Sequence, residues 1–216
     1  MTFAFFDIDR TVLGGRAQLS ALYYFWRRGW LKSRAWPALI YAGLRHQLKR
    51  ALGRPDTDRL LAVAYSFTAG HRLEDLEKEM EILFESRIKK RILVAARKEI
   101  KQHQSAGRSV VLVSTALESL ADLIARELKV DQVVCSRLKT KSGYLTGAFE
   151  RIVFGQEKLN QAQAISSDLS KDYFYSDCFS DLPLLQAVGF PRAVNPDRRL
   201  KKIAVREKWP IYYWYN

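Results

Sequence analysis

Residues 3–13, FAFFDIDRTVL, decide the fold of this chain. The first four are apolar, which predicts a short strand buried on both faces, as in the middle of a parallel sheet. Asp7, Asp9 and Thr11 follow at alternate positions, and buried carboxylates are costly unless a cation compensates them. Because Mg²⁺ prefers hard carboxylate oxygens, the stretch favours a magnesium site. The other interpretation of this stretch is a polar turn whose aspartates cap the next segment.

The composition indicates a folded protein with an anionic partner. The chain has 216 residues, of which 48% are hydrophobic, enough for one domain of ordinary size and a modest second lobe. Its formal net charge is +13. A charge of this size attracts phosphorylated substrates, nucleic acid or an acidic membrane surface.

Cysteine usage and hydropathy favour the cytoplasm. The two cysteines, Cys135 and Cys178, lie far apart without C-x-x-C spacing, so we expect thiols in a reducing cytosol rather than a disulfide. No signal peptide is visible, because the first strand begins at residue 3 and carries charge by residue 7. The longest apolar run, residues 35–44, is shorter than the roughly 20 residues of a membrane span. We expect a cytoplasmic protein, soluble or peripheral at the inner face of the membrane.

The second half of the chain alternates helices and strands. This alternation predicts an α/β, doubly wound (Rossmann-like) fold, with a parallel sheet, helices on both faces and right-handed crossovers. A small β-hairpin is expected over 139–147, turning at Ser142-Gly143. The core domain is expected to comprise residues 1–13 and 95–216. The expected strands are 109–113, 132–135, 173–176 and 191–194, and the expected helices are 95–106, 117–128, 156–166 and 183–188.

Residues 14–94 are expected to form an inserted, all-helical cap domain between the first strand and the rest of the core. Their apolar residues recur at helical spacing, most clearly in the amphipathic segment 72–93. Pro55 and Asp56 begin another helix, which ends at Gly70. The two helices before it are expected over 17–30 and 34–51.

The segment 16–54 is basic and aromatic. It has nine lysines and arginines and no Asp or Glu, interleaved with Tyr, Trp and Phe. One interpretation is a helical pair with an aromatic core and solvated arginines. The other is contact with an anionic membrane surface, which basic aromatic helices suit. Nucleic acid is the least favoured partner.

Polar side chains follow the ends of several expected strands. In open α/β sheets, ligands bind beyond the carboxyl ends of the strands, so these side chains should converge on one edge. Carboxylates around Mg²⁺, with an amine and hydroxyls nearby, form a site for a phosphoryl group, and a carboxylate can itself be the nucleophile. The chain has no P-loop, HExxH or GxSxG motif, which argues against a P-loop nucleotidase, a zinc protease and a serine hydrolase. The converging residues are Asp7, Asp9, Ser114, Thr115, Lys158, Asp177 and Asp181.

These motifs, in this order and spacing, resemble the haloacid dehalogenase superfamily. Within it the chain is similar to subfamily IB, which includes phosphoserine phosphatase and has a helical cap after the first motif. The matching stretches are FDIDRTV at 6–12, VST at 113–115, Lys158 and YSDCFSDLPLL at 175–185; the segments 137–147 and 194–200 also resemble this branch.

The resemblance implies a phosphatase that acts through an aspartyl-phosphate. Asp7 would attack phosphorus. Asp9 would protonate the leaving group and then deprotonate the hydrolytic water, which requires a raised carboxyl pKa. Mg²⁺ would be held by Asp7, the backbone carbonyl of Asp9, and Asp177.

The same resemblance implies how the phosphoryl group is held. Thr11 and the hydroxyl pair Ser114 and Thr115 would bind its oxygens. Lys158 would neutralise the developing charge, and Asp181 would orient the surrounding groups.

One departure bears on the substrate. In phosphoserine phosphatases a glutamate nine residues after the nucleophile binds the amino group of the substrate, and here that position is Arg16. This reversal of charge would repel a zwitterionic serine ester and favours an anionic one.

Three functions stay open on the sequence alone. The first is a Mg²⁺-dependent phosphomonoesterase for a small anionic phosphate ester. The second is a phospholipid head-group phosphatase at the membrane surface, since the basic cap resembles that of the phosphatidylglycerophosphate phosphatases. The third is a non-catalytic protein that binds a membrane or an acidic partner. Asp9 argues against the third, because a vestigial site has no need of that carboxyl.

Overall fold

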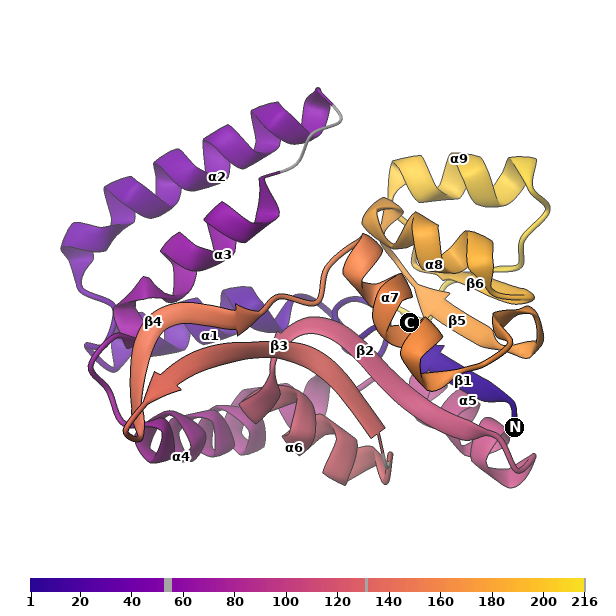
Figure 1. Cartoon of the computed structure of the whole chain (residues 1–216), viewed down its shortest axis with the longest axis horizontal. Helices are drawn as coiled ribbons and strands as arrows, with labels where there is room; N and C mark the ends of the chain where they lie inside the picture. The colour runs from indigo at the N-terminus through magenta and orange to yellow at the C-terminus, as the bar shows by residue number, and fades with distance from the viewer. Residues whose placement is uncertain (53–55, 131, 216) are drawn as a thin grey trace.

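A mixed sheet forms the centre of the molecule (Figure 1). The computed structural model describes residues 1–52, 56–130 and 132–215. Within these residues the sheet has seven strands in the order β4-β3-β2-β1-β5-β6-β7, and all neighbours are parallel except β3 and β4. The strands are β1 (Phe3–Phe6), β2 (Ser109–Leu117), β3 (Gln132–Lys141), β4 (Tyr144–Arg151), β5 (Tyr173–Ser176), β6 (Phe190–Val194) and β7 (Ile211–Tyr212).

Helices cover both faces of the sheet, which confirms the doubly wound α/β prediction. Successive residues of β1 point to opposite faces: Phe5 joins one apolar cluster, and Ala4 and Phe6 join the other. The cluster around Phe6 includes residues of α5 (Val94–Ser105) and α6 (Glu118–Leu128). The cluster around Phe5 includes residues of α7 (Gln156–Ile165), α8 (Leu182–Ala187) and α9 (Arg198–Arg206).

The predicted hairpin turn is present at Ser142 and Gly143, whose φ angles are 52° and 80°. Two successive residues in the left-handed region make the tight turn that suits the twist of a hairpin. β2 continues to Leu117, beyond its predicted end, and 132–135 and the first arm of the hairpin form one continuous strand, β3. From Ser136 to Lys141 only Leu138 is apolar, and its side chain is buried.

Helices make up most of the chain between β1 and β2. Before α5 the α-helices are α1 (Ala17–Arg27), α2 (Trp36–Ala51), α3 (Thr57–Tyr65) and α4 (Leu73–Leu83). The single long helix predicted over 72–93 is wrong beyond residue 83, where a π-helical turn (Phe84–Ile88) and a 3₁₀ turn (Lys89–Arg91) follow. Pro55, predicted to begin a helix, lies outside the described residues.

These inserted helices pack on the sheet as well as on one another. Phe25, Leu61 and Met80 belong to the same apolar cluster as α5 and α6. Figure 1 shows α3 beside the sheet and α2 beyond it, at the upper left. In the described part of the chain, no helix combines the length and apolarity that crossing a membrane requires.

The aromatic C-terminus packs on the edge of the sheet. β7 pairs with β6, and Trp214 stacks on Tyr175 with the ring centroids 5.9 Å apart. Neither α9 nor β7 was predicted, since α9 (RRLKKIAVR) is mostly charged and β7 has two residues.

A buried histidine links α5 to the sheet. The hydroxyl of Tyr175 donates to Glu99 at 2.7 Å, and Nε2 of His103 lies 2.8 Å from the same hydroxyl. Because the tyrosine proton goes to Glu99, Nε2 acts as the donor to the Tyr175 oxygen, and Nδ1 is left to accept from Arg108 at 3.3 Å. The ring is therefore neutral, and burial, assisted by Arg108, lowers the pKa of His103 to about 4.

This neutral histidine makes stability depend on pH. An unfolded histidine titrates near about 6.5, so the unfolded chain takes up a proton first as the pH falls. The contribution of neutral His103 to the stability of the folded chain is complete above about pH 6.5, and it is lost progressively as the pH falls to about 4. We expect the urea midpoint to fall more between pH 7 and pH 5 in the wild type than in His103→Gln. An equal fall of the urea midpoint in both proteins would contradict a buried, neutral His103.

Candidate active site

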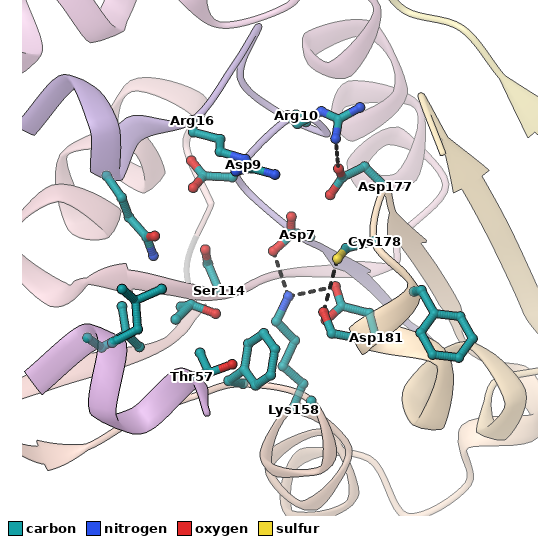
Figure 2. Close-up of a pocket in the computed structure, with 18 of the residues that line it drawn as sticks. Asp7, Asp9, Arg10, Arg16, Thr57, Ser114, Lys158, Asp177, Cys178 and Asp181 are labelled. Atoms are coloured by element: carbon teal, nitrogen blue, oxygen red, sulfur yellow. Dashed lines mark hydrogen bonds and ion pairs between the residues drawn. The ribbon is translucent and has the colours of Figure 1, made fainter. Parts of the chain in front are cut away.

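A cavity of about 490 Å³ lies at the carboxyl ends of β1, β2 and β5 (Figure 2). β1 lies between β2 and β5, where the chain switches from one half of the sheet to the other, the usual position of a ligand site in this fold. The sheet side of the cavity carries Asp7, Asp9, Ser114, Thr115, Lys158, Asp177 and Asp181, so the predicted carboxylates, amine and hydroxyl pair lie together.

Lys158 connects two of the aspartates. Its ammonium donates to Oδ1 of Asp7 at 2.6 Å and to Oδ2 of Asp181 at 2.7 Å. Lys158 is 2% exposed and lies in the first turn of α7, directly after Phe154 and Gly155 bring the chain over the cavity. Ser176, the last residue of β5, donates to the same oxygen of Asp181 at 2.6 Å. Hydrogen bonds thus fix the side chains of Asp7, Lys158 and Asp181 relative to one another, and Ser176 holds Asp181.

Burial and neighbouring charges shift the pKa values of this pair. Burial raises the pKa of Asp7 well above its ordinary value, and the Lys158 ammonium opposes that shift. The negative charges of Asp181 and Asp177 raise it further. Burial alone would lower the pKa of Lys158, but the carboxylates of Asp181 and Asp7 outweigh it and raise it. The lysine therefore stays charged, and it opposes the rise in the pKa of Asp7 without cancelling it.

Asp9 faces the start of α1. The backbone N–H of Ala17 donates to its Oδ1 at 2.7 Å, which fixes the carboxyl on the side of the cavity next to Arg16 (Figure 2). Burial raises the pKa of Asp9, and the Ala17 hydrogen bond opposes the shift. A raised pKa makes this carboxyl better suited to donate and accept a proton than an exposed aspartate.

Arg10 is a site residue that the sequence-based prediction missed. Its guanidinium lies 3.2 Å from Oδ2 of Asp177. Burial raises the pKa of Asp177, and Arg10 opposes that shift. Arg10 has a left-handed φ of 60°, and its carbonyl accepts from the side-chain amide of Asn195 at 2.9 Å. The signal in the sequence was its position inside the first motif, between Asp9 and Thr11.

The donor set at the strand ends fits Mg²⁺. The negative charge of Asp177 raises the pKa of Asp7, and those of Asp181 and Asp9 raise the pKa of Asp177, so a bound cation would relieve this repulsion. Carboxylates with one backbone carbonyl, that of Asp9, are the oxygen ligands that Mg²⁺ takes beside several waters. Within residues 1–52, 56–130 and 132–215, no group of three or more His, Cys, Asp and Glu side chains could hold a metal ion. Although four aspartates line the cavity, no three of their side chains are therefore arranged as metal ligands, and the candidate ligands are the carboxylates of Asp7 and Asp177 and the carbonyl of Asp9.

The three predicted hydroxyls differ in placement. Ser114 lines the cavity, and its oxygen accepts from the backbone of Ala116 at 3.2 Å, which leaves its proton free. Thr115 lines the cavity too, but its hydroxyl donates to the carbonyl of Val153 at 2.9 Å. Thr11 is fully buried, has no partner for its hydroxyl and does not line the cavity. The contact of Thr11 with phosphoryl oxygens stays a prediction.

The inserted helices form the opposite wall. Arg16 and Gln18 come from the start of α1, and His46, Gln47 and Thr57 from α2 and α3. Nδ1 of His46 and Oγ1 of Thr57 are buried atoms without a hydrogen-bond partner. The sequence alone indicates no role for the residues from α2 and α3, because no local pattern reveals which turns of these helices face the cavity.

Comparisons with known proteins agree with this geometry. Residues 4–186 match the family of haloacid dehalogenase-like hydrolases. A Streptomyces azureus protein named "Inhibition of morphological differentiation protein" is 34% identical over 97% of this chain and 77% of its own length. A histidinol-phosphatase of Neisseria meningitidis is 27% identical over 96% of both chains, and a Mycobacterium tuberculosis protein named phosphoserine phosphatase is 28% identical over 96% of this chain and 69% of its own.

One solved structure shows how far the fold extends. A protein of unknown function from Bordetella pertussis Tohama I superposes over the full length of both chains with a TM-score of 0.86, at 23% sequence identity. The whole architecture, inserted helices included, therefore occurs in another protein.

The Lys158 bridge predicts a measurable loss of stability. Replacing Lys158 by Met leaves two buried carboxylates without their shared cation, which should lower the free energy of unfolding by roughly 3 kcal/mol. The control is Lys171→Met, which breaks an ion pair to Asp168 at the surface and should change stability little. Urea unfolding of both variants checks this, and equal effects would contradict the bridging role.

Proposed function

We propose that this chain, which belongs to the haloacid dehalogenase-like hydrolase family and is a phosphatase, hydrolyses a small anionic phosphate ester with Asp7 as the nucleophile. The observation that carries the proposal is the Lys158 ammonium between Asp7 and Asp181 in the wall of the cavity. It lowers the pKa of the attacking carboxylate, against the effect of burial, and supplies positive charge where the phosphoryl oxygens would lie.

In the proposed reaction a carboxylate oxygen of Asp7 bonds to phosphorus while the bond to the ester oxygen breaks. Asp9 donates its proton to that oxygen, so the leaving group departs as an alcohol. A water molecule then attacks the phosphorus of the phospho-aspartate and gives a proton to Asp9. Phosphate leaves, and both carboxyls return to their starting states. The raised pKa of Asp9 supports its part as the acid.

The other strand-end groups bind the phosphoryl group. The free proton of Ser114 suits one of its oxygens, and Asp181 holds Lys158 in place. Asp7, Asp177 and the Asp9 carbonyl would hold Mg²⁺, which when bound offsets the charge of the phosphoryl oxygens. Arg10 competes with that ion for Asp177, so it would move or share the carboxylate on binding.

The wall formed by the inserted helices suggests the class of ester. We propose that residues 14–94 act as a cap that contacts the leaving group. Apart from Asp7, Asp9, Asp177 and Asp181, the lining includes no acid, and its cap side offers Arg16, Gln18, His46, Gln47 and Thr57. This wall favours an anionic leaving group that also accepts hydrogen bonds. The relatives' names, phosphoserine phosphatase and histidinol-phosphatase, differ in substrate, so neither substrate transfers to this chain.

The nucleophile can be tested with p-nitrophenyl phosphate. Wild type with Mg²⁺ should release p-nitrophenol, and EDTA or Asp7→Asn should abolish release by removing the metal or the attacking oxygen. Lys171→Met serves as the control and should keep full activity, since its ion pair is exposed. Turnover by Asp7→Asn at the wild-type rate would rule out Asp7.

Asp9→Asn should separate the two chemical steps. The p-nitrophenolate leaving group needs little protonation, so the first step should survive, whereas the water attack loses its base. We expect a burst of about one equivalent of p-nitrophenol per enzyme, followed by slow turnover. An alkyl phosphate should give no burst with this variant. If Asp9→Asn loses the same fraction of its activity with both esters and shows no burst, the role of Asp9 as acid and base is contradicted.

Arg16→Glu should change the preferred leaving group. Beside a glutamate, an ester with an ammonium group should gain in kcat/KM relative to one with a carboxylate, by about tenfold or more. Phosphoethanolamine and 3-phosphoglycerate provide the two charges. Arg27→Glu, an exposed charge reversal at the other end of α1, is the matched control. If Arg16→Glu leaves the ratio of kcat/KM for the two esters unchanged, Arg16 does not determine which leaving group is preferred.

A further inference from the structure

The outer face of α2 carries large apolar side chains in contact with solvent. Ile40, Leu44 and Leu48 lie four residues apart and are 59%, 67% and 66% exposed. Tyr41 and Leu52 extend the row and are 61% and 72% exposed. Four residues is close to one turn, so these side chains share one face, which we call the α2 stripe. Isolated apolar residues are common on surfaces, but a continuous row indicates an interaction.

The rest of α2 is occupied by the protein itself. The helix packs against α3, with Ala42 buried in the contact. Arg45 and Lys49 donate to Asp56 at 3.1 and 3.2 Å, and His46 lines the cavity. Ile40, Leu44 and Leu48 lie on the helix face opposite Ala42 and His46. Figure 1 shows α2 as the outermost element of that part of the molecule.

The charges around the stripe are positive. Residues 16–55 include no Asp or Glu. Arg27, Lys32 and Arg34, which precede α2, are exposed. α9 adds further exposed cations and lies with α2 along the upper edge of Figure 1. Its Arg199 lines the same cavity as His46 and Gln47, so α2 and α9 stand on two sides of one opening. The exposed cations of α9 are Arg198, Arg199, Lys201, Lys202 and Arg206.

We propose that the α2 stripe docks on the surface of an anionic lipid bilayer. Its aliphatic side chains would enter the boundary between head groups and acyl chains, while the surrounding lysines and arginines, those of α9 included, contact the anionic head groups. The helix would lie in the plane of the membrane. The cavity, which α2 and α9 border, would then open close to the lipid surface.

Charge complementarity selects this occupant. A second copy of the chain would bring one cationic face against another, which costs energy. The phosphates of a nucleic acid would bind the cations, but they would make no favourable contact with the aliphatic side chains of the α2 stripe. An anionic bilayer alone satisfies an aliphatic stripe and its cationic border together. The inference concerns location and is independent of the reaction proposed for the cavity.

Co-sedimentation of the full chain with vesicles tests the proposal. One set of vesicles contains equal parts of phosphatidylglycerol and phosphatidylcholine, and the other contains phosphatidylcholine alone. We expect binding to the first set at low ionic strength, weaker binding at about 0.15 M salt, and little binding to the second. The test needs no activity, so the result is separate from that of the phosphatase assays.

Two double variants separate the apolar and the electrostatic parts. Ile40→Gln with Leu44→Gln should lower the partition coefficient about tenfold or more, because two apolar side chains lose their burial in the lipid. Lys201→Gln with Lys202→Gln should weaken binding and reduce its dependence on salt. Ile82→Gln with Val94→Gln is the matched control, since both residues are exposed and lie in or next to α4 and α5, along the lower part of Figure 1.

Three outcomes would overturn the proposal. The first is equal binding to both vesicle sets, or binding to neither. The second is an Ile40→Gln/Leu44→Gln variant that melts like the wild type and binds like the control. The third is a concentration-dependent dimer in sedimentation velocity that this variant abolishes, without vesicle binding, which would make the stripe a contact between copies of the chain.

Discussion

The structure depends on a buried contact between the carboxylate of Asp7 and the ammonium of Lys158. Asp7 is 5% exposed at the end of a strand buried on both faces, and burial raises its pKa. Lys158 opposes that rise, with bonds of 2.6 and 2.7 Å to Asp7 and Asp181. The lysine itself can be buried only because two carboxylates share it. In the proposed reaction the same contact would serve both the fold, by compensating buried charge, and the chemistry, by positioning the nucleophile.

Sheet topology brings these partners together from distant parts of the sequence. Asp7 follows β1, Asp177 and Asp181 follow β5, and Lys158 begins the helix that leads into β5. β1 and β5 are parallel neighbours, so their carboxyl ends coincide, and the N–H of Asp7 bonds to the carbonyl of Tyr175 at 2.9 Å. The insertion between β1 and β2 then supplies the other wall of the cavity. One half of the site thus comes from the sheet and the other from the inserted helices. In the proposed reaction the first would hold the phosphoryl group and the second would face the rest of the substrate.

The sheet and its strand ends could be predicted from the sequence because they depend on local patterns. Phe3–Phe6 is an apolar run, the Ser142-Gly143 turn has its own signature, and polar residues mark the strand ends. Other features depend on tertiary placement. Arg10, which has a left-handed backbone, reaches Asp177, and Thr11 is buried outside the lining of the cavity in spite of its place in the motif. His46 and Thr57 face the cavity because of how α2 packs on α3, and α9 lacks the apolar run that would have revealed it.

The central claim is that Asp7 becomes covalently phosphorylated during turnover, and borohydride trapping tests it most directly. An acyl phosphate on an aspartate is reduced to homoserine, whereas a free carboxylate is not. Trypsin releases residues 1–10 as one peptide that contains both Asp7 and Asp9, and fragmentation in the mass spectrometer distinguishes them. The account predicts homoserine at position 7, dependent on Mg²⁺ and substrate. Reduction at position 9, or no reduction during steady turnover, would contradict it.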